Sequence, residues 1–152
     1  MAIVTSNSPE ETQAIGAAWG RSARSGWVLA LQGDLGVGKT QLVRGLAVGL
    51  ECPARVHSPT FALLHIYEGG RLLLHHLDLY RLNTLEDIEQ AGLLEYLWQP
   101  EGVTVVEWAD RWLGEQLPCP DAALLPTGGL RCVRMQTLEN GSRRMSYEDF
   151  GH

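Results

Sequence analysis

The fold of this chain is indicated by Gly33-Asp34-Leu35-Gly36-Val37-Gly38-Lys39-Thr40. This stretch has the form G-x-x-x-x-G-K-[ST], the phosphate-binding P-loop. Its glycines allow backbone N–H groups to approach an anion closely, and the helix that follows presents the positive end of its dipole to the same anion. We expect Lys39 to reach the β- and γ-phosphates of a nucleotide and the Thr40 hydroxyl to bind Mg²⁺.

The flanking residues have the pattern that a P-loop requires. The run from Trp27 to Leu31 is apolar, as a buried parallel strand should be. The following segment, 39–50, carries apolar residues at helical spacing, namely Leu42, Val43, Leu46 and Leu50. Lys39 is the only lysine among the 12 basic residues of the chain. A glycine-rich turn that merely caps a helix is the alternative interpretation, and the order of strand, loop and helix disfavours it.

Composition limits the classes of protein to consider. A chain of 152 residues with an ordinary globular composition is expected to form a single domain over residues 1–152. Its net charge of −6 and pI of about 5.3 argue against a general basic surface for nucleic acid or anionic lipid. The cysteines (Cys52, Cys119 and Cys132) are too few and too widely spaced for a disulfide framework or a metal site, and we expect buried thiols. Without a signal pattern or an apolar run of membrane-spanning length, we expect a cytoplasmic protein with no membrane association.

The remaining elements follow from local patterns. A helix is predicted from Ser8, which can cap it, with Pro9 in the first turn, Glu11 closing a capping box, and an apolar face that includes Ala18. Further predictions are a hairpin of 61–67 and 71–77, a helix from 83 with a buried face through Ala91 to Trp98, a strand over 103–106, a helix over 109–117, and a C-terminal hairpin of 130–138 and 142–147 around Asn140-Gly141 that forms an edge of the sheet or a tail.

Two acidic residues follow predicted strands. Asp78 ends the second strand of the first hairpin, and Glu107 ends the strand over 103–106. Carboxylates at strand ends commonly contact Mg²⁺ in P-loop proteins, directly or through water. His75 and His76 point to opposite faces of a strand, so they cannot form a ligand pair, and we interpret them as structural.

Positions 57–61, His57-Ser58-Pro59-Thr60-Phe61, allow two interpretations. The segment is either a proline turn that enters a strand or a switch-like loop that offers the Thr60 hydroxyl to Mg²⁺ or to the γ-phosphate. Trp108 likewise belongs either to the core or to the side of the nucleotide. The chain has neither the N-K-x-D pattern that reads guanine nor a D-x-x-G after the second strand, and its length leaves little room for the lid of a small-molecule kinase.

Four motifs in order resemble the TsaE (YjeE) family, the bacterial ATPases of tRNA threonylcarbamoyladenosine synthesis. They are the P-loop, Ser58-Pro59-Thr60-Phe61, His76-Leu77-Asp78-Leu79-Tyr80-Arg81-Leu82 and Val106-Glu107-Trp108. The resemblance covers residues 8–113 well and the last forty residues weakly. It implies an α/β fold, a P-loop NTPase-like three-layer domain with a mixed central sheet in which parallel strands are joined by an antiparallel hairpin.

The resemblance also implies activity, partners and site residues. ATP and Mg²⁺ would be the cofactors, and TsaD and TsaB the partners. ATP turnover would reset their complex between rounds of modification, so that tRNA is contacted only indirectly and TsaD performs the transfer. The P-loop residues Gly33, Asp34, Leu35, Gly36, Val37, Gly38 and Lys39 would bind phosphates, Thr40 and Glu107 the metal, and Asp78, Glu107, Lys39 and Thr60 would act in hydrolysis. Trp108 would lie near the site, and Ser6, Ser8 and an arginine at 131 or 134 beside the base.

Two other functions agree with the same residues. One is a nucleotide switch that does not need hydrolysis, and the other is a small kinase that phosphorylates a metabolite. Because phosphoryl transfer depends mainly on positioning and charge neutralisation, an isolated domain with no obvious arginine finger is expected to hydrolyse ATP slowly until partners complete or gate its site.

Overall fold

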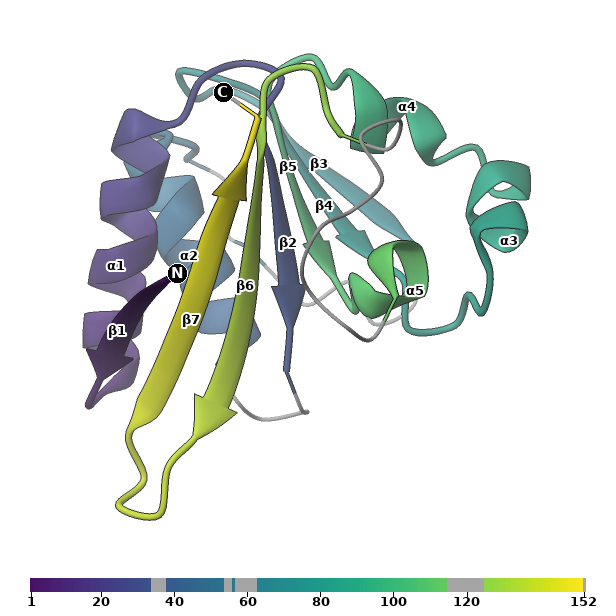
Figure 1. The fold of residues 1–152 in the computed structure, drawn as a ribbon. Coiled ribbons are helices and arrows are strands. Elements are labelled where there is room, and N and C mark those ends of the chain that lie inside the picture. The colour runs from purple at the N-terminus through teal and green to yellow at the C-terminus, as the bar shows by residue number, and fades with distance from the viewer. Residues whose placement is uncertain (34–37, 54–55, 57–62, 115–124, 152) are drawn as a thin grey trace.

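The computed structural model describes residues 1–33, 38–53, 56, 63–114 and 125–151. Within these residues, seven strands form one sheet in the order β1-β7-β6-β2-β5-β4-β3 (Figure 1). The strands are β1 (Ala2–Ser6), β2 (Val28–Gln32), β3 (Leu64–Tyr67), β4 (Leu74–Asp78), β5 (Val103–Glu107), β6 (Leu130–Thr137) and β7 (Arg143–Phe150). The central strands β4, β5, β2 and β6 run parallel, whereas β3, β7 and β1 pair antiparallel with their neighbours. The predicted mixed sheet is therefore confirmed.

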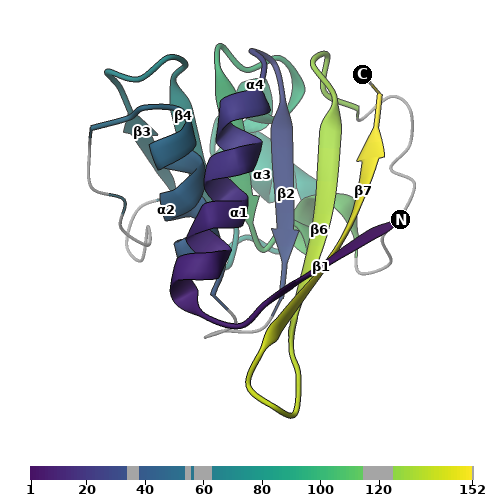
Figure 2. The same ribbon diagram turned by 90° about the vertical axis from the view of Figure 1, so that its left-hand side faces the viewer.

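Helices cover both faces of this sheet. The first two, α1 (Pro9–Ser22) and α2 (Lys39–Gly49), lie side by side on one face, as Figure 2 shows. The others, α3 (Leu85–Gln90), α4 (Leu94–Trp98) and α5 (Asp110–Leu113), lie on the opposite face (Figure 1). This is the three-layer α/β arrangement that the sequence predicts.

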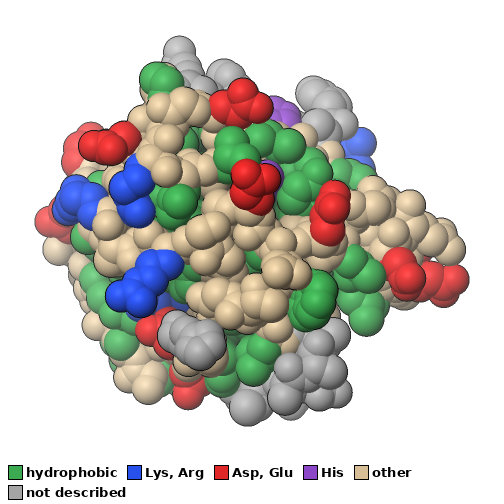
Figure 3. Space-filling model, turned by 90° about the horizontal axis from the view of Figure 1, so that it is seen from above, with side chains coloured by type: hydrophobic (Ala, Val, Ile, Leu, Met, Phe, Trp, Pro, Cys, Tyr) green, Lys and Arg blue, Asp and Glu red, His purple; other side chains and the backbone are tan. Residues whose placement is uncertain are grey.

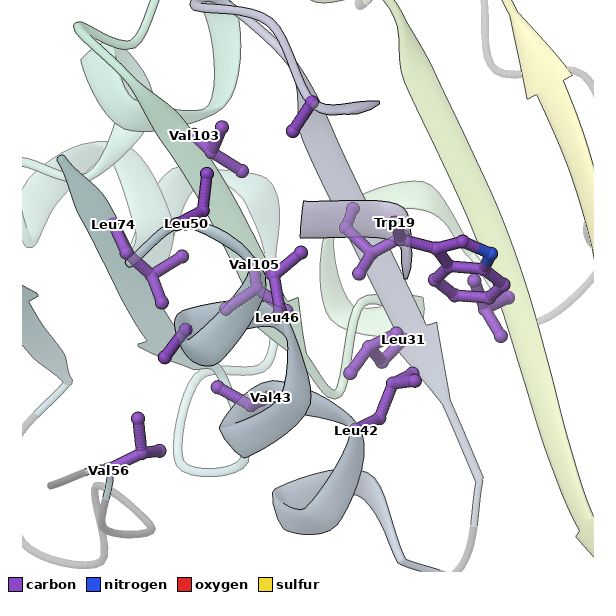
Figure 4. Close-up of a cluster of buried hydrophobic side chains, with 14 of the residues drawn as sticks. Trp19, Leu31, Leu42, Val43, Leu46, Leu50, Val56, Leu74, Val103 and Val105 are labelled. Atoms are coloured by element: carbon purple, nitrogen blue, oxygen red, sulfur yellow. The ribbon is translucent and has the colours of Figure 1, made fainter. Parts of the chain in front are cut away.

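The helix α2 holds the P-loop strand through a continuous apolar face. Leu42, Val43, Leu46 and Leu50 are fully buried, as predicted. In Figure 4 the side chains of α2 and of Leu50, the residue after it, lie among Leu31 of β2, Val103 and Val105 of β5 and Leu74 of β4. Burying side chains of this size stabilises the folded state by about 1.5–3 kcal/mol each, so this contact fixes the start of α2 relative to the strand ends.

The two helices α1 and α2 approach each other through glycines. A Cβ added to Gly45 would lie 2.0 Å from the backbone oxygen of Gln13, and one added to Gly16 would lie 2.3 Å from that of Leu42. Gly20 and Gly49 are equally close to the facing backbone. At the start of α1, the Ser8 side chain accepts a hydrogen bond from the Glu11 N–H at 3.1 Å, which confirms the predicted cap. Ala18, however, is exposed, and the glycine side of the helix is buried in its place.

Two predicted elements differ in the structure. The helix predicted from residue 83 is divided into α3 and α4, because Gly92 adopts a φ of 77° between them, and as a result Ala91 is exposed and Trp98 is 55% exposed. The C-terminal hairpin, β6 and β7, is not at the edge of the sheet. β6 pairs parallel with β2. β1, a strand not predicted from the sequence, pairs antiparallel with the other side of β7 and forms this edge of the sheet.

Two of the three cysteines carry the buried thiols that the composition predicts. Cys52 and Cys132 are free and buried, and burial, with a smaller effect of Glu148 and Asp149, raises the pKa of Cys132 to about 12. Cys119 lies outside the described residues. Figure 3 shows acidic, basic and hydrophobic side chains interspersed over the face at the amino ends of the parallel strands. None of the described helices has the length and apolar composition needed to cross a membrane.

Candidate nucleotide site

A cavity of about 420 Å³ lies at the carboxyl ends of the parallel strands. It brings together residues from distant parts of the sequence. The lining includes Ser6, Ser8, Gly38, Lys39, Thr40, Asp78, Glu107, Trp108 and Arg143. In open α/β sheets, ligands bind outside the carboxyl ends of the strands, so this is the expected position for a nucleotide.

The described part of the P-loop faces this cavity. Gly38 has a φ of 99° and precedes the first turn of α2, where unpaired backbone N–H groups favour an anion. The Lys39 ammonium donates a hydrogen bond to the Gly33 oxygen at 2.6 Å and lies 4.2 Å from the centre of the Trp108 ring. Asp34, Leu35, Gly36 and Val37 lie outside the described residues, as does Thr60 with the whole of its predicted switch-like segment.

Asp78 and Glu107 end the neighbouring parallel strands β4 and β5 and stand opposite each other in the register. Glu107 is 4% exposed, whereas Asp78 is half-buried and accepts a hydrogen bond from the Tyr80 N–H at 2.9 Å. Burial raises the pKa of Asp78 above its ordinary value, and the charge of Glu107 adds to this, while the Tyr80 hydrogen bond and the charges of His76 and Lys39 oppose it. Two carboxylates in this position have the chemistry of a divalent-cation site.

Thr40 also lines this cavity, and its side chain carries a hydroxyl oxygen. The described residues hold no group of three or more His, Cys, Asp and Glu side chains that could bind a metal by themselves. A cation here would therefore be shared between one or two carboxylates, the hydroxyl and the phosphates of a nucleotide, which is how Mg²⁺ is usually held.

The two histidines of β4 do point to opposite faces, but they have different surroundings. His75 packs against Tyr96 with ring centres 4.9 Å apart, and its Nε2 lies 2.8 Å from the Glu101 oxygen. His76 is fully buried, and its Nε2 lies 2.5 Å from Oε2 of Glu107. The interpretation of His76 as purely structural thus missed its contact with a site residue. Its spacing of two residues from Asp78, which puts both on one face of the strand, is the signal that could have indicated it.

The serines assigned to the base line the cavity, but their hydroxyls are used locally. Ser6 is fully buried, with Oγ 2.7 Å from Oγ1 of Thr12 and donating to the Ser8 oxygen at 2.8 Å. Ser8 caps α1. These hydrogen bonds hold the N-terminal segment beside the P-loop helix.

The structure does not bring Arg131 to this cavity. Its guanidinium forms two hydrogen bonds with Asp149, at 2.6 and 2.9 Å, and lies 4.5 Å from the centre of the Tyr147 ring. Arg143 lines the cavity instead and donates to the Gly141 oxygen at 2.7 Å. The sequence shows that Arg143 follows the Asn-Gly turn. It does not show that this turn lies beside the cavity.

A second cavity, of about 680 Å³, lies beyond Trp108. Gln32, Gly33, Asp110, Arg134 and Arg144 contribute to its lining, and Trp108 lines both cavities. Arg134, the other arginine considered for the base, therefore faces the neighbouring cavity rather than the one that holds Thr40 and Glu107.

Comparison with known proteins agrees with this geometry. The sequence profile of a family described as "Threonylcarbamoyl adenosine biosynthesis protein TsaE" matches residues 6–139. The chain belongs to the TsaE family. Proteins of this family take part in the biosynthesis of threonylcarbamoyladenosine on tRNA, and Lys39, Thr40, Asp78 and Glu107 lie within the matched region.

Individual members of the TsaE family are similar over most of the chain. The TsaE protein of Bacillus subtilis is 46% identical over 110 residues, which are 72% of this chain and 67% of that protein. The TsaE protein of Treponema pallidum is 44% identical over 113 residues, or 74% of this chain and 82% of that protein. The crystal structure of B. subtilis YdiB superposes with a TM-score of 0.71 at 29% identity and covers 99% of this chain and 86% of that chain.

Proposed function

We propose that this chain binds and hydrolyses ATP with Mg²⁺ and thereby allows the TsaB–TsaD complex to form threonylcarbamoyladenosine on tRNA over repeated turnovers. The observation that carries the proposal is the convergence of Lys39, Thr40, Asp78 and Glu107 on one cavity at the strand ends. Membership of the TsaE family supports the pathway. In this proposal the protein acts in the cytoplasm, contacts tRNA only through its partners, and does not itself transfer the threonylcarbamoyl group.

Binding of the triphosphate rests on the start of α2. The N–H groups after Gly38 and the Lys39 ammonium are the donors for its oxygens. Lys39 donates to the Gly33 oxygen, and because an ammonium group has three N–H donors it can keep this hydrogen bond while it donates to a phosphate. The described N-terminal residues, Ser6 to Ser8, are proposed to border the nucleoside.

Thr40 and Glu107 are the residues proposed to hold Mg²⁺. Mg²⁺ held by these residues would supply positive charge to the phosphate oxygens. Asp78 is proposed to orient the attacking water, since its carboxylate lies opposite Glu107 and already accepts one hydrogen bond from Tyr80. Hydrolysis by the isolated chain is expected to be slow, with TsaB and TsaD completing or gating the site.

The test is Mg²⁺-dependent hydrolysis of ATP and GTP by the purified chain, alone and with TsaB plus TsaD. We expect weak ATP turnover that rises with both partners and disappears in Lys39→Ala. Turnover that ignores the partners, or that requires a small-molecule acceptor, would contradict the proposal and favour a kinase. Asp78→Ala tests the alternative of a pure switch, because a switch should still support tRNA modification, whereas an ATPase should bind ATP and stall.

A further inference from the structure

His76 and Glu107 form a short, buried side-chain contact at the site, and the proposed reaction does not use it. His76 Nε2 lies 2.5 Å from Glu107 Oε2, and the two side chains are 0% and 5% exposed. A hydrogen bond from an N–H to a carboxylate is short and strong when the carboxylate is ionised. Burying an ionised carboxylate to this degree without a partner would cost free energy of folding. The hydrogen bond from His76, on the neighbouring strand, offsets that cost.

Glu107 is the only partner that the described residues provide for the polar atoms of His76. Its second nitrogen, Nδ1, is buried and has no hydrogen-bond partner among them. The ring of Tyr67 lies against it, with ring centres 6.4 Å apart. Since Nε2 faces a carboxylate, we assign its proton to that nitrogen. The imidazole is therefore oriented by apolar packing on one side and by Glu107 on the other.

We infer that His76 is a positioning residue for the metal ligand Glu107. By donating to Oε2, it holds the Glu107 side chain in one rotamer and leaves the other carboxylate oxygen for a cation in the cavity that Glu107 lines. Hydrogen bonds to the ligands of a metal commonly set their orientation, and removing one lowers metal affinity about 10- to 100-fold. This inference rests on the proposed function, because it assumes that Glu107 binds Mg²⁺.

Three substitutions separate positioning from packing. His76→Leu fills similar space but has no donor. His76→Gln keeps an amide N–H near the place of Nε2, whereas His76→Asn carries its amide closer to the backbone, near the place of Nδ1, and does not reach Glu107. If His76 acts only by packing, the loss of Mg²⁺ affinity should follow the volume and polarity of the new side chain. If it positions Glu107, only His76→Gln should retain Mg²⁺ affinity.

The adjacent histidine provides a matched control. His75 is also buried in β4, but it faces α4 and lies against Tyr96 and the Glu101 backbone oxygen. His75→Leu should cost stability in the same way as His76→Leu without changing Glu107. Thermal unfolding in EDTA measures that shared cost for each variant.

The experiment is a fluorescence titration of a labelled ATP analogue, first in EDTA and then at increasing Mg²⁺. We expect His76→Leu and His76→Asn to raise the Mg²⁺ concentration at half-saturation about 10- to 100-fold, with nucleotide affinity in EDTA unchanged. His76→Gln should recover most of the Mg²⁺ affinity, and His75→Leu should match the wild type.

The outcomes distinguish this inference from the proposed function. If the wild type shows no Mg²⁺-dependent change in nucleotide binding, the metal site itself is refuted, and the role of His76 with it. If the wild type responds to Mg²⁺ and His76→Leu responds at the same concentration, the inference alone is overturned. An equal loss in His75→Leu, or a loss in His76→Gln as large as in His76→Asn, would assign the effect to packing and overturn it as well.

Discussion

Trp108 adopts a left-handed backbone conformation, with a φ of 59°, directly after the Glu107 carboxylate. For a residue with a bulky side chain this conformation costs about 1–2 kcal/mol, so the surrounding contacts must hold it. They include the Lys39 ammonium 4.2 Å from the ring centre and the Tyr80 ring at 4.9 Å. The strained backbone thus places the ring between the P-loop lysine and the second cavity, which it also lines.

Replacing Asp78 with Asn is expected to raise the thermal unfolding midpoint of the ligand-free protein at neutral pH. Burial and the charge of Glu107 raise the pKa of Asp78 in the folded state. The folded state then binds the proton more tightly than the unfolded state, so stability from this group is full at low pH and is lost as pH rises through the raised pKa. Asparagine is neutral and can still accept the hydrogen bond from Tyr80.

Calorimetry in EDTA at neutral pH measures this effect, with Glu68→Gln, an exposed position outside the helices and strands, as a control that should leave the midpoint unchanged. A lower midpoint for the variant in EDTA would contradict the expectation.

The pair α1 and α2 shows how glycine spacing sets the distance between two helices. Each helix carries glycines four residues apart, Gly16 and Gly20 in α1 and Gly45 and Gly49 in α2. Residues at this spacing share one face, so the two backbones approach each other without intervening side chains. Since α2 begins at the P-loop and α1 follows Ser8, this contact also fixes the N-terminal segment beside the nucleotide cavity.

Gly45→Ala is expected to destabilise the protein by about 1–3 kcal/mol through overpacking, because the new Cβ would lie 2.0 Å from the Gln13 oxygen. The sign of the change in unfolding free energy distinguishes overpacking from helix propensity, since alanine in a helix interior ordinarily stabilises by about 0.5–1 kcal/mol relative to glycine. Chemical denaturation gives the free energy of unfolding. Ala18→Gly, at an exposed position of α1, reports the ordinary cost of helix propensity, about 1 kcal/mol. A stabilised Gly45→Ala would show that the helices can separate freely.

The sheet joins both ends of the chain. β7 pairs with β6 over eight residues and with β1 over five, and β6 pairs in turn with the P-loop strand β2. The family match ends at residue 139, in the turn between β6 and β7, yet β7 carries Met145 and Tyr147, which pack into the core beside Trp19. The last strand is therefore part of the scaffold that supports the site.

Deleting residues 139–152 is expected to abolish cooperative unfolding, because it removes β7, leaves β1 without a partner and exposes one side of β6. Deleting residues 1–4 removes only edge pairs and should lower stability while preserving a cooperative transition. Circular dichroism during thermal unfolding compares the two truncations. A cooperative transition in the C-terminal truncation would contradict this prediction.

Much of this architecture was predictable because it depends on local patterns. The P-loop, the cap at Ser8, the buried face of α2 and the hairpin of β3 and β4 each follow from residues a few positions apart. The spacing of Gly16 and Gly20 was equally visible, but the backbone that they contact was not. The break at Gly92 could not be predicted from the apolar spacing around it, since a single glycine is tolerated in many helices.

The composition of the site depended on pairings between distant strands. His76 meets Glu107 only because β4 lies parallel to β5 in one register, and Arg143 lines the cavity only because the β6–β7 hairpin joins the sheet beside β2. Arg131 is directed away by Asp149 across the same hairpin. Local sequence specifies which residues form a strand and which face they share, but the choice of neighbouring strand is made by the packing of both sheet faces, which involves the entire chain.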